Sequence, residues 1–149
     1  YSNPFPPSSI TMEITSFGTL SILYNNLLPG RAKRNIANYF GLPDTVFASW
    51  LHSIVYIRNI CAHHCRLWNK ALSIRPLMPR SPRKPFVTLP ANGTRQVYFI
   101  LSMIVYLLDI INPNHSFVTR FKDLLNRYPS IDVRAMGFPA NWENEDIWK

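Results

Sequence analysis

Apolar positions along the chain recur at the spacing of helices. Five segments repeat an apolar residue every three to four positions, and turn-forming pairs such as Pro29-Gly30 and Asn112-Pro113 separate them. Alternation of apolar and polar residues, which would indicate strands, is nowhere long enough to build a sheet. The pattern therefore predicts an all-α fold, a single-domain helical bundle over residues 1–149. The expected helices span residues 8–28, 31–40, 45–72, 94–111 and 116–127.

A proline-rich loop separates the third and fourth expected helices. Residues 73–92 contain five prolines and no Asp or Glu, so we expect an irregular segment with at most one short extended piece, at residues 86–89. We call residues 73–92 the basic arm. Its charged residues are Arg75, Arg80, Arg83 and Lys84. The chain after Pro129 is also expected to be irregular and is rich in aromatic residues.

Charge is unevenly distributed along the chain. The sequence holds 16 Lys and Arg against 8 Asp and Glu, for a net charge of +8. No acidic residue lies between Asp44 and Asp109, although eight Lys and Arg fall in that interval. Because a solvated surface normally mixes charges of both signs, a long segment of one sign indicates a site for anions. Nucleic acid is the polyanionic partner that we expect.

The third expected helix has two distinct faces. The first is apolar apart from one arginine, and its members are Phe47, Trp50, Leu51, Ile54, Arg58, Cys61, Ala62 and Cys65. The second is polar or aromatic without any acid, and its members are His52, Tyr56, Asn59, His63, Arg66 and Lys70. A guanidinium on an apolar face is costly unless it is paired. Arg58 is therefore either the partner of a distant carboxylate or a fork for a phosphate group. The carboxylates considered for such a pair are Glu13, Asp44 and Asp109.

His63 follows Asn59 by one turn on the polar face. A single histidine on a helix is more often inert than functional, so its neighbours decide the interpretation. An asparagine at this spacing could fix the tautomer of the imidazole or contact a substrate. Imidazole exchanges protons near neutral pH, which suits general acid–base catalysis.

Cys61 and Cys65 stand four residues apart on the same expected helix, a geometry that does not favour a disulfide. We expect reduced thiols and hence a cytoplasmic protein. Together with His63 and His64 the cysteines resemble a zinc ligand set. On a straight helix, however, the cysteines point into the apolar face and His63 points away from it. We therefore expect no metal and no cofactor.

The run RNICAH at residues 58–63 resembles the R-x4-6-H motif of the HEPN superfamily. The longer run RNICAHHCRLWN, residues 58–69, resembles the signature of the abortive-infection (Abi) bacteriophage-resistance family of the AbiD/AbiF type. Similar pieces stand at residues 16–20 (SFGTL), 49–51 (SWL) and 137–139 (GFP). Members of that family are usually longer, so the resemblance also implies that this chain is the C-terminal part of a longer protein.

The resemblance implies a HEPN-like helical bundle, often a two-fold homodimer, in which apposed motifs form a metal-independent ribonuclease site. Arg58 takes the place of the motif arginine, Asn59 that of its polar neighbour and His63 that of the histidine. We expect His63 to take a proton from the RNA 2′-OH while Arg58 stabilises the developing negative charge. On an ideal helix these two side chains stand about 140° apart. Their convergence then needs the long arginine side chain, a local distortion or a second copy.

The expected function is that of a metal-independent endoribonuclease in an anti-phage abortive-infection system. The residues expected to bind the substrate are Tyr56, His64, Arg66, Lys70, Arg80, Arg83 and Lys84. The expected partners are RNA and a second copy of the chain. A membrane is not expected, because the most apolar run, residues 97–108, is shorter than the roughly 20 residues that cross a bilayer. The alternative function is a non-catalytic HEPN-like module that binds nucleic acid or protein.

Overall fold

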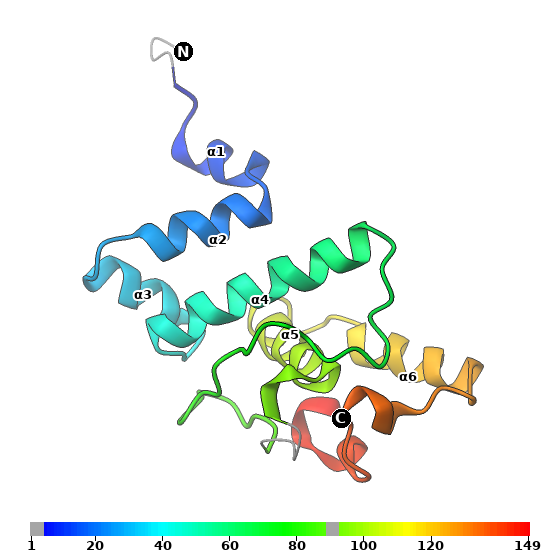
Figure 1. Ribbon diagram of the computed structural model, residues 1–149. Coiled ribbons are helices and arrows are strands. Elements are labelled where there is room, and N and C mark those ends of the chain that lie inside the picture. The colour runs from blue at the N-terminus through cyan, green and yellow to red at the C-terminus, as the bar shows by residue number, and fades with distance from the viewer. Residues whose placement is uncertain (1–4, 89–92) are drawn as a thin grey trace.

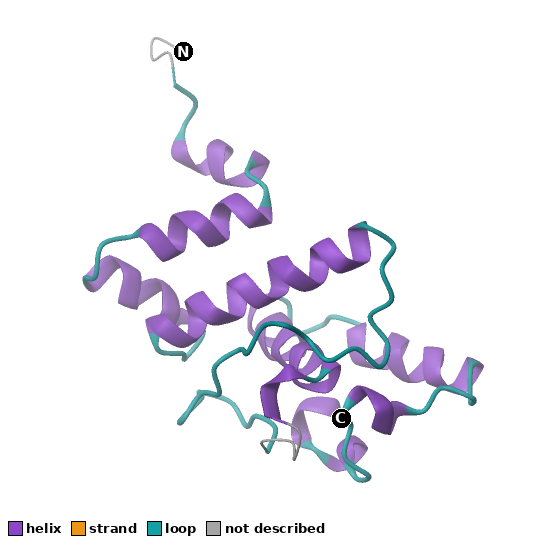
Figure 2. Ribbon diagram, in the orientation of Figure 1, coloured by secondary structure: helices purple, strands orange, loops and turns teal. Residues whose placement is uncertain are grey.

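The computed structural model describes residues 5–88 and 93–149, and these residues form helices joined by loops (Figures 1 and 2). The α-helices are α1 (Ser8–Ile14), α2 (Phe17–Asn26), α3 (Arg31–Tyr39), α4 (Asp44–Ala62), α5 (Val97–Ile111) and α6 (Phe117–Arg127). Short 3-10 helices are η1 (Gly93–Arg95), η2 (Val133–Met136), η3 (Trp142–Asn144) and η4 (Asp146–Trp148). The described residues contain no strand, so the all-α prediction is confirmed.

The first expected helix, residues 8–28, is two helices. The chain is extended at Thr15 and Ser16, between α1 and α2. Ser16 is the N-cap of α2, and its hydroxyl oxygen accepts a hydrogen bond from the backbone N–H of Thr19 at 3.1 Å. A serine that satisfies one of the free N–H groups of a new helix competes with continuation of the preceding one. The single-helix prediction missed this internal cap.

The third expected helix ends ten residues early, at Ala62 instead of Leu72. His64 has a φ of 53°, in the left-handed region. The N–H of His64 donates to the carbonyl of Cys61 at 3.1 Å, and the N–H of Cys65 donates to that of Ile60 at 3.0 Å. These two bonds make the Schellman ending of a helix, usually built on glycine. Because a histidine takes the glycine position here, the chain carries no ordinary stop signal at this point.

The core lies where α4 crosses α5, and Trp50 is at its centre (Figure 1). Trp50 is fully buried, and its ring contacts those of Phe86 and Tyr106 at centroid distances of 5.2 and 5.5 Å. Its indole N–H donates to the carbonyl oxygen of Leu77 at 2.8 Å. This bond and the contact with Phe86 fix the basic arm against α4.

The C-terminal segment is irregular, as predicted, but it is packed. Phe138, Trp142 on η3 and Trp148 on η4 place aromatic rings against α5 and α6. The cluster consists of Tyr98, Phe121, Phe138, Trp142 and Trp148. Trp148 is fully buried, and its indole N–H donates to the hydroxyl of Ser102 at 3.2 Å. The tail therefore completes the hydrophobic core around α5.

The basic arm runs back along α4 without forming a strand at residues 86–88, and residue 89 of the expected extended piece lies outside the described residues. At its start, Leu72 and Arg95 are joined by two hydrogen bonds. The N–H of Leu72 donates to the carbonyl of Arg95 at 3.0 Å, and the guanidinium Nε of Arg95 donates back to the carbonyl of Leu72 at 2.6 Å. Within residues 5–88 and 93–149, no helix is both long and apolar enough to cross a bilayer.

The buried face of α4 differs from the predicted one. The side chains that it buries are Val46, Phe47, Trp50, Ser53, Ile57 and Ile60. Arg58, Cys61 and Cys65, which were expected on the apolar face, are exposed, so this part of the prediction is wrong. The buried face was hard to recognise from the sequence because it includes the polar residue Ser53. The hydroxyl of Ser53 can be buried because it donates a hydrogen bond to the carbonyl of Ser49 at 2.7 Å.

Candidate functional site

The helices α2 and α4 pack side by side and run in opposite directions (Figure 1). At the start of α2, a Cβ placed on Gly18 would lie 3.8 Å from a methyl carbon of Val55. Further along, the rings of Tyr24 and Phe47 meet edge to face at 4.9 Å. The N-terminal end of α2 therefore lies beside the C-terminal half of α4, where the predicted motif residues stand.

Arg58 and Asn59 line an open pocket of about 300 Å³ at this junction. The pocket is completed by Ser16, Phe17, Gly18 and Val55. The guanidinium of Arg58 donates to the side-chain oxygen of Asn59 at 3.2 Å. This bond orients the guanidinium and leaves most of its five N–H donors available to a ligand.

The environment of Arg58 excludes the structural ion pair that the sequence left open. In the described part of the chain, the ion pairs join His115 to Asp109 and Lys149 to Asp146. Neither involves Arg58, which is solvent-exposed. An exposed guanidinium with no carboxylate partner can accept a phosphate without breaking an existing pair.

His63 is the C-cap of α4, with φ −91° and ψ 17°. Its backbone N–H donates to the carbonyl of Asn59 at 3.0 Å, while its exposed imidazole makes no hydrogen bond to any described residue. The side-chain oxygen of Asn59 is engaged by Arg58 instead. The structure thus brings Arg58 and Asn59 together, and it does not join Asn59 to the imidazole of His63. His63 is also absent from the lining of the Arg58 pocket.

Helix ends add to the positive potential of the pocket. The start of α2 carries a partial positive charge, and Gly18 adds no side chain at this point of the pocket lining. Arg58 lies before the last turn of α4 and contributes through the full charge of its guanidinium. Both features favour an anion between α2 and α4.

Of the other expected substrate-binding residues, Tyr56 lies on α4 and Lys70 on the loop beyond it. The hydroxyls of Tyr56 and Ser73 are 3.4 Å apart, and this hydrogen bond lowers the pKa of Tyr56, with a smaller contribution from the charge of Lys70. Arg66 is exposed and lies past the end of the helix. The expected continuous polar strip therefore stops at His63, because α4 ends there.

The basic arm places Arg83 and Lys84 at the end of α4 that lies opposite Arg58. The backbone of Arg83 packs against Gly41, in the turn before α4, and its N–H donates to the hydroxyl of Tyr106 at 3.2 Å. The ammonium of Lys84 donates to the carbonyl of Asp109 at 3.0 Å, near the end of α5. Since α4 rises about 1.5 Å per residue, Arg83 lies roughly 25 Å from Arg58 along its axis. Arg80 is exposed on the same arm.

The described residues hold no group of three or more His, Cys, Asp or Glu placed to bind a metal ion. Cys61 and Cys65 are free thiols. His115 forms a pair with Asp109 at 2.8 Å through Nε2, while its Nδ1 accepts the N–H of Phe117 at 3.1 Å. Both nitrogens of that ring are used in holding the turn between α5 and α6, so it is a structural pair.

Sequence reasoning missed the contribution of α2 to the pocket. Ser16, Phe17 and Gly18 were noted only as part of a family resemblance. The signal that could have located them is the combination of a helix-capping serine with a glycine two residues later, which opens a helix end to a neighbour.

Comparison with known protein families finds a match to the first part of the chain. Residues 1–69 match the model of the family described as Abi-like protein. No match to the chain was found among curated proteins or among solved structures. The matched segment holds α1 to α4 and every residue of the Arg58 pocket, whereas the basic arm, α5, α6 and the aromatic tail lie outside it. Over residues 1–69 the chain is therefore similar to Abi-like proteins.

Proposed function

We propose that this chain is a metal-independent endoribonuclease of a bacterial abortive-infection system, with Arg58 and His63 as its catalytic residues. The observation that carries the proposal is the open, carboxylate-free pocket around Arg58 and Asn59, one turn before His63 and within the Abi-like segment. The resemblance of residues 58–63 to the HEPN motif supports the same assignment.

The reaction proposed is attack of the RNA 2′-hydroxyl on the adjacent phosphorus. His63 accepts the proton of that hydroxyl, the new P–O bond forms, and the bond to the 5′-oxygen breaks. The products are a 2′,3′-cyclic phosphate and a free 5′-hydroxyl. The leaving oxygen takes its proton from a protonated imidazole, which is the His63 of a second copy of the chain.

Arg58 stabilises the phosphoryl oxygens as their charge rises. Its guanidinium lines the pocket together with the N-terminal residues of α2, so the positive charge is in place before the negative charge develops. Asn59 positions the guanidinium through its hydrogen bond. Asn59 is thus assigned a positioning role, in place of the contact with His63 that the sequence suggested.

A homodimer is part of the proposal, because one chain supplies one His63. An apolar groove of about 330 Å³ at the α2–α4 contact supports an association of this kind. It is lined by α1, α2, α3 and α4, with exposed side chains that include Met12, Leu23 and Ile36. Exposed apolar side chains gathered in one place are a feature of protein interfaces. Analytical ultracentrifugation of wild type and Leu23→Asp measures the association.

A non-catalytic binding module is the second candidate function. It is favoured by the imidazole of His63, which has no hydrogen-bond partner among the described residues to fix its tautomer. Such a module would bind RNA or protein through the same surfaces and leave RNA intact.

The test is incubation of purified protein with labelled single-stranded RNA in EDTA. Wild type should cleave it to 2′,3′-cyclic phosphate ends and spare DNA of the same sequence, which lacks the 2′-hydroxyl. His63→Ala should lower the rate by about 10²–10⁴-fold without unfolding the protein. Cys65→Ala is the matched control, since Cys65 is exposed at the same helix end and is given no role.

Arg58→Ala should abolish cleavage, and Arg58→Lys should restore only part of it, since a lysine keeps the charge but not the planar fork. Cleavage that needs a divalent metal, cleavage of DNA, or a full rate in His63→Ala would each contradict the mechanism. RNA that is bound but never cleaved would favour the second candidate.

A further inference from the structure

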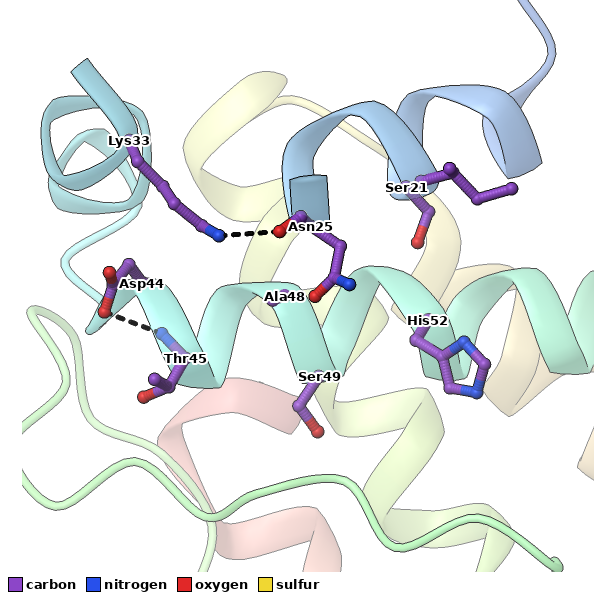
Figure 3. Close-up of a pocket in the computed structure, with 9 residues that line it drawn as sticks. Ser21, Asn25, Lys33, Asp44, Thr45, Ala48, Ser49 and His52 are labelled. Atoms are coloured by element: carbon purple, nitrogen blue, oxygen red, sulfur yellow. Dashed lines mark hydrogen bonds between the residues drawn. The ribbon is translucent and has the colours of Figure 1, made fainter. Parts of the chain in front are cut away.

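A second and larger pocket, of about 460 Å³, opens between α2, α3 and the first half of α4 (Figure 3). Its polar lining comes from Ser21 and Asn25 on α2, Lys33 on α3, and Asp44 and His52 on α4. Figure 3 shows the amide of Asn25 reaching from α2 toward α4, and the imidazole of His52 projecting from α4 further along the same helix. None of these residues belongs to the motif at the end of α4.

Some polar groups of this pocket are available to a ligand, whereas the ammonium of Lys33 is already used. The ammonium of Lys33 is used by the carbonyls of Asn25 and Leu27, at 2.9 and 3.2 Å, and so closes the C-terminal end of α2. One carboxylate oxygen of Asp44 accepts the N–H of Thr45 at 2.9 Å. The side-chain amide of Asn25 and the imidazole of His52 make no hydrogen bond to another described residue. The pocket therefore offers a paired donor and acceptor, a carboxylate oxygen and an aromatic face.

This combination fits a nucleobase. A side-chain amide pairs with a base edge through two hydrogen bonds, and a carboxylate accepts from an exocyclic amino group. Unstacked bases of single-stranded RNA are bound by stacking on aromatic or imidazole rings together with hydrogen bonds to their edges. Lys33 and Asp44 have opposite charges, so this pocket, unlike the Arg58 pocket, does not select for a phosphate.

The two pockets lie next to each other along the α2–α4 contact. On α2 the lining residues Gly18, Ser21 and Asn25 share a face, and on α4 His52 and Asn59 share another, each at helical spacing. Arg58 lies on the neighbouring stripe of α4 with Leu51, which lines the apolar groove, and Phe17 lines both that groove and the Arg58 pocket. From residues 48–49 to residues 58–59 the distance along α4 is about 15 Å. A few nucleotides of a single strand span that distance.

The cations stand at the two ends of this path. Arg58 lies at one end, and the basic arm with Arg83 packs beside Gly41 at the other. The wall of the base pocket joins the arm directly, because the hydroxyl of Ser49 accepts the N–H of Leu77 at 3.1 Å. In proteins that bind a single strand, cations contact the phosphates and position the strand, while other side chains contact the bases. The arrangement here has cations at both ends and a base pocket between them.

We infer that the α2–α4 surface that carries these two pockets binds a single RNA strand, and that the pocket of Asn25, Asp44 and His52 holds one of its bases, away from the scissile phosphate. This subsite prefers a base with an exocyclic amino group over uracil. The inference rests on the proposed function, since it takes the Arg58 pocket as the place where the strand is cut.

The experiment measures the affinity of the full chain for labelled single-stranded oligomers of A, C, G or U at fixed salt. His63→Ala serves as the background, so that cleavage does not disturb the titration. In that background Asn25→Ala should weaken binding of the tightest-binding A, C or G oligomer by about 5- to 100-fold. It should also reduce the difference in affinity between that oligomer and the U oligomer. His52→Ala should weaken all oligomers by a similar factor, because it removes the ring on which the base stacks.

The matched control is Asn26→Ala, because Asn26 is the next residue on α2, is exposed and does not line the pocket. It should bind as the background does. Asn25→Gln, which retains the amide, should recover part of the base preference. Thermal melts establish that the variants are folded.

The binding experiment tests the base subsite independently of the proposed ribonuclease activity. If Asn25→Ala and His52→Ala bind every oligomer as tightly as the control does, the subsite is overturned even where wild type cleaves RNA. If mononucleotides perturb the NMR signals of Asn25 and His52 while oligomers do not, the pocket takes a free nucleotide and the strand path is overturned. Base-selective binding that these substitutions remove supports the subsite even if no cleavage is detected.

Discussion

Gly41 is the position where a single methyl group should separate the basic arm from α4. It has a φ of 64°, in the left-handed region, and it lies in the turn between α3 and α4. A Cβ added there would stand 2.2 Å from the Cβ of Arg83, and 3.1 and 3.2 Å from the N and Cα of the same residue. These are backbone atoms and the first side-chain carbon, so a rotamer change cannot relieve the clash.

The cost of Gly41→Ala has two parts. A left-handed conformation costs an alanine about 1–2 kcal/mol. Carbon atoms pack best at about 3.5–4.0 Å, so the arm must move outward by roughly 1.5 Å. That movement strains the hydrogen bond from the N–H of Arg83 to the hydroxyl of Tyr106, which is 3.2 Å long. With overpacking included, the free energy of unfolding should fall by about 3–5 kcal/mol.

Gly93→Ala is the matched control. Gly93 also has a left-handed φ, of 73°, but a Cβ added there meets no atom of the described residues within 4 Å. It should therefore cost only the conformational part, about 1–2 kcal/mol. The loss of unfolded-state freedom on replacing glycine by alanine is the same in both variants and cancels in their difference.

Urea denaturation followed by far-UV circular dichroism measures both variants. Limited proteolysis within the arm should be faster in Gly41→Ala than in Gly93→Ala, because the arm is displaced only in the former. Equal destabilisation of the two variants would refute the packing of Arg83 on Gly41, and with it the position of the arm's cations at the far end of α4.

Three further predictions concern the helix end, a buried carboxyl group and the arm. His64→Gly should raise the free energy of unfolding by up to about 1 kcal/mol, because glycine takes the left-handed position without strain, whereas His64→Ala should bring no such gain in urea titrations. Burial raises the pKa of Glu145 in the folded state, although the hydrogen bond from Tyr98 opposes this, so wild type should lose stability relative to Glu145→Gln as the pH rises above the unfolded value of about 4.3. Urea denaturation of both proteins at several pH values measures this difference. A wild type that gains stability relative to Glu145→Gln as the pH rises would contradict the prediction. Serine in place of three of the four basic residues of the arm should flatten the salt dependence of RNA affinity, by about 0.7 log units per log unit of salt for each phosphate that the arm no longer binds. An unchanged slope would remove the arm from the RNA surface. The residues replaced are Arg80, Arg83 and Lys84.

Helices bounded by proline and glycine or marked by a regular apolar face were predictable from the sequence. A helix end that depends on a residue other than glycine in the left-handed conformation was not. The helix 31–40 follows Pro29-Gly30, and the structure places α3 at Arg31–Tyr39. The helix 116–127 matches α6, Phe117–Arg127, because its apolar positions recur strictly on one face. The helix expected to reach residue 72 stops at Ala62, since the stop depends on the left-handed backbone of His64. Helix propensity does not report that conformation for a histidine.

The candidate site was predictable in its residues but not in its surroundings. Arg58 and Asn59 were selected from sequence, and they do share a pocket. Arg58 was expected on the apolar face of α4 but is exposed, because two adjacent stripes of the helix are nearly equal in apolar content. Packing decides which one faces inward, as in the contact of Trp50 with Tyr106 of α5.

The geometry of α4 also narrows how Arg58 and His63 can act on one phosphate. The helix α4 is regular to Ala62, and the chain leaves it at the C-cap His63, where φ is −91° and ψ is 17°. The helix itself therefore does not reduce the separation of about 140° that ideal geometry sets between the two side chains. Arg58 faces the pocket beside α2, and His63 does not line it. If both groups are to meet at the same phosphorus, either the arginine side chain extends along the helix end or the histidine comes from another chain. The proposed two-fold arrangement brings the partner's His63 to the phosphate as the acid for the leaving oxygen, whereas the His63 of the same chain, as the base, requires the arginine side chain to extend along the helix end. A catalytic role for His63 therefore depends on self-association of the chain, because a second copy has to supply the second imidazole. The two are tested as one hypothesis.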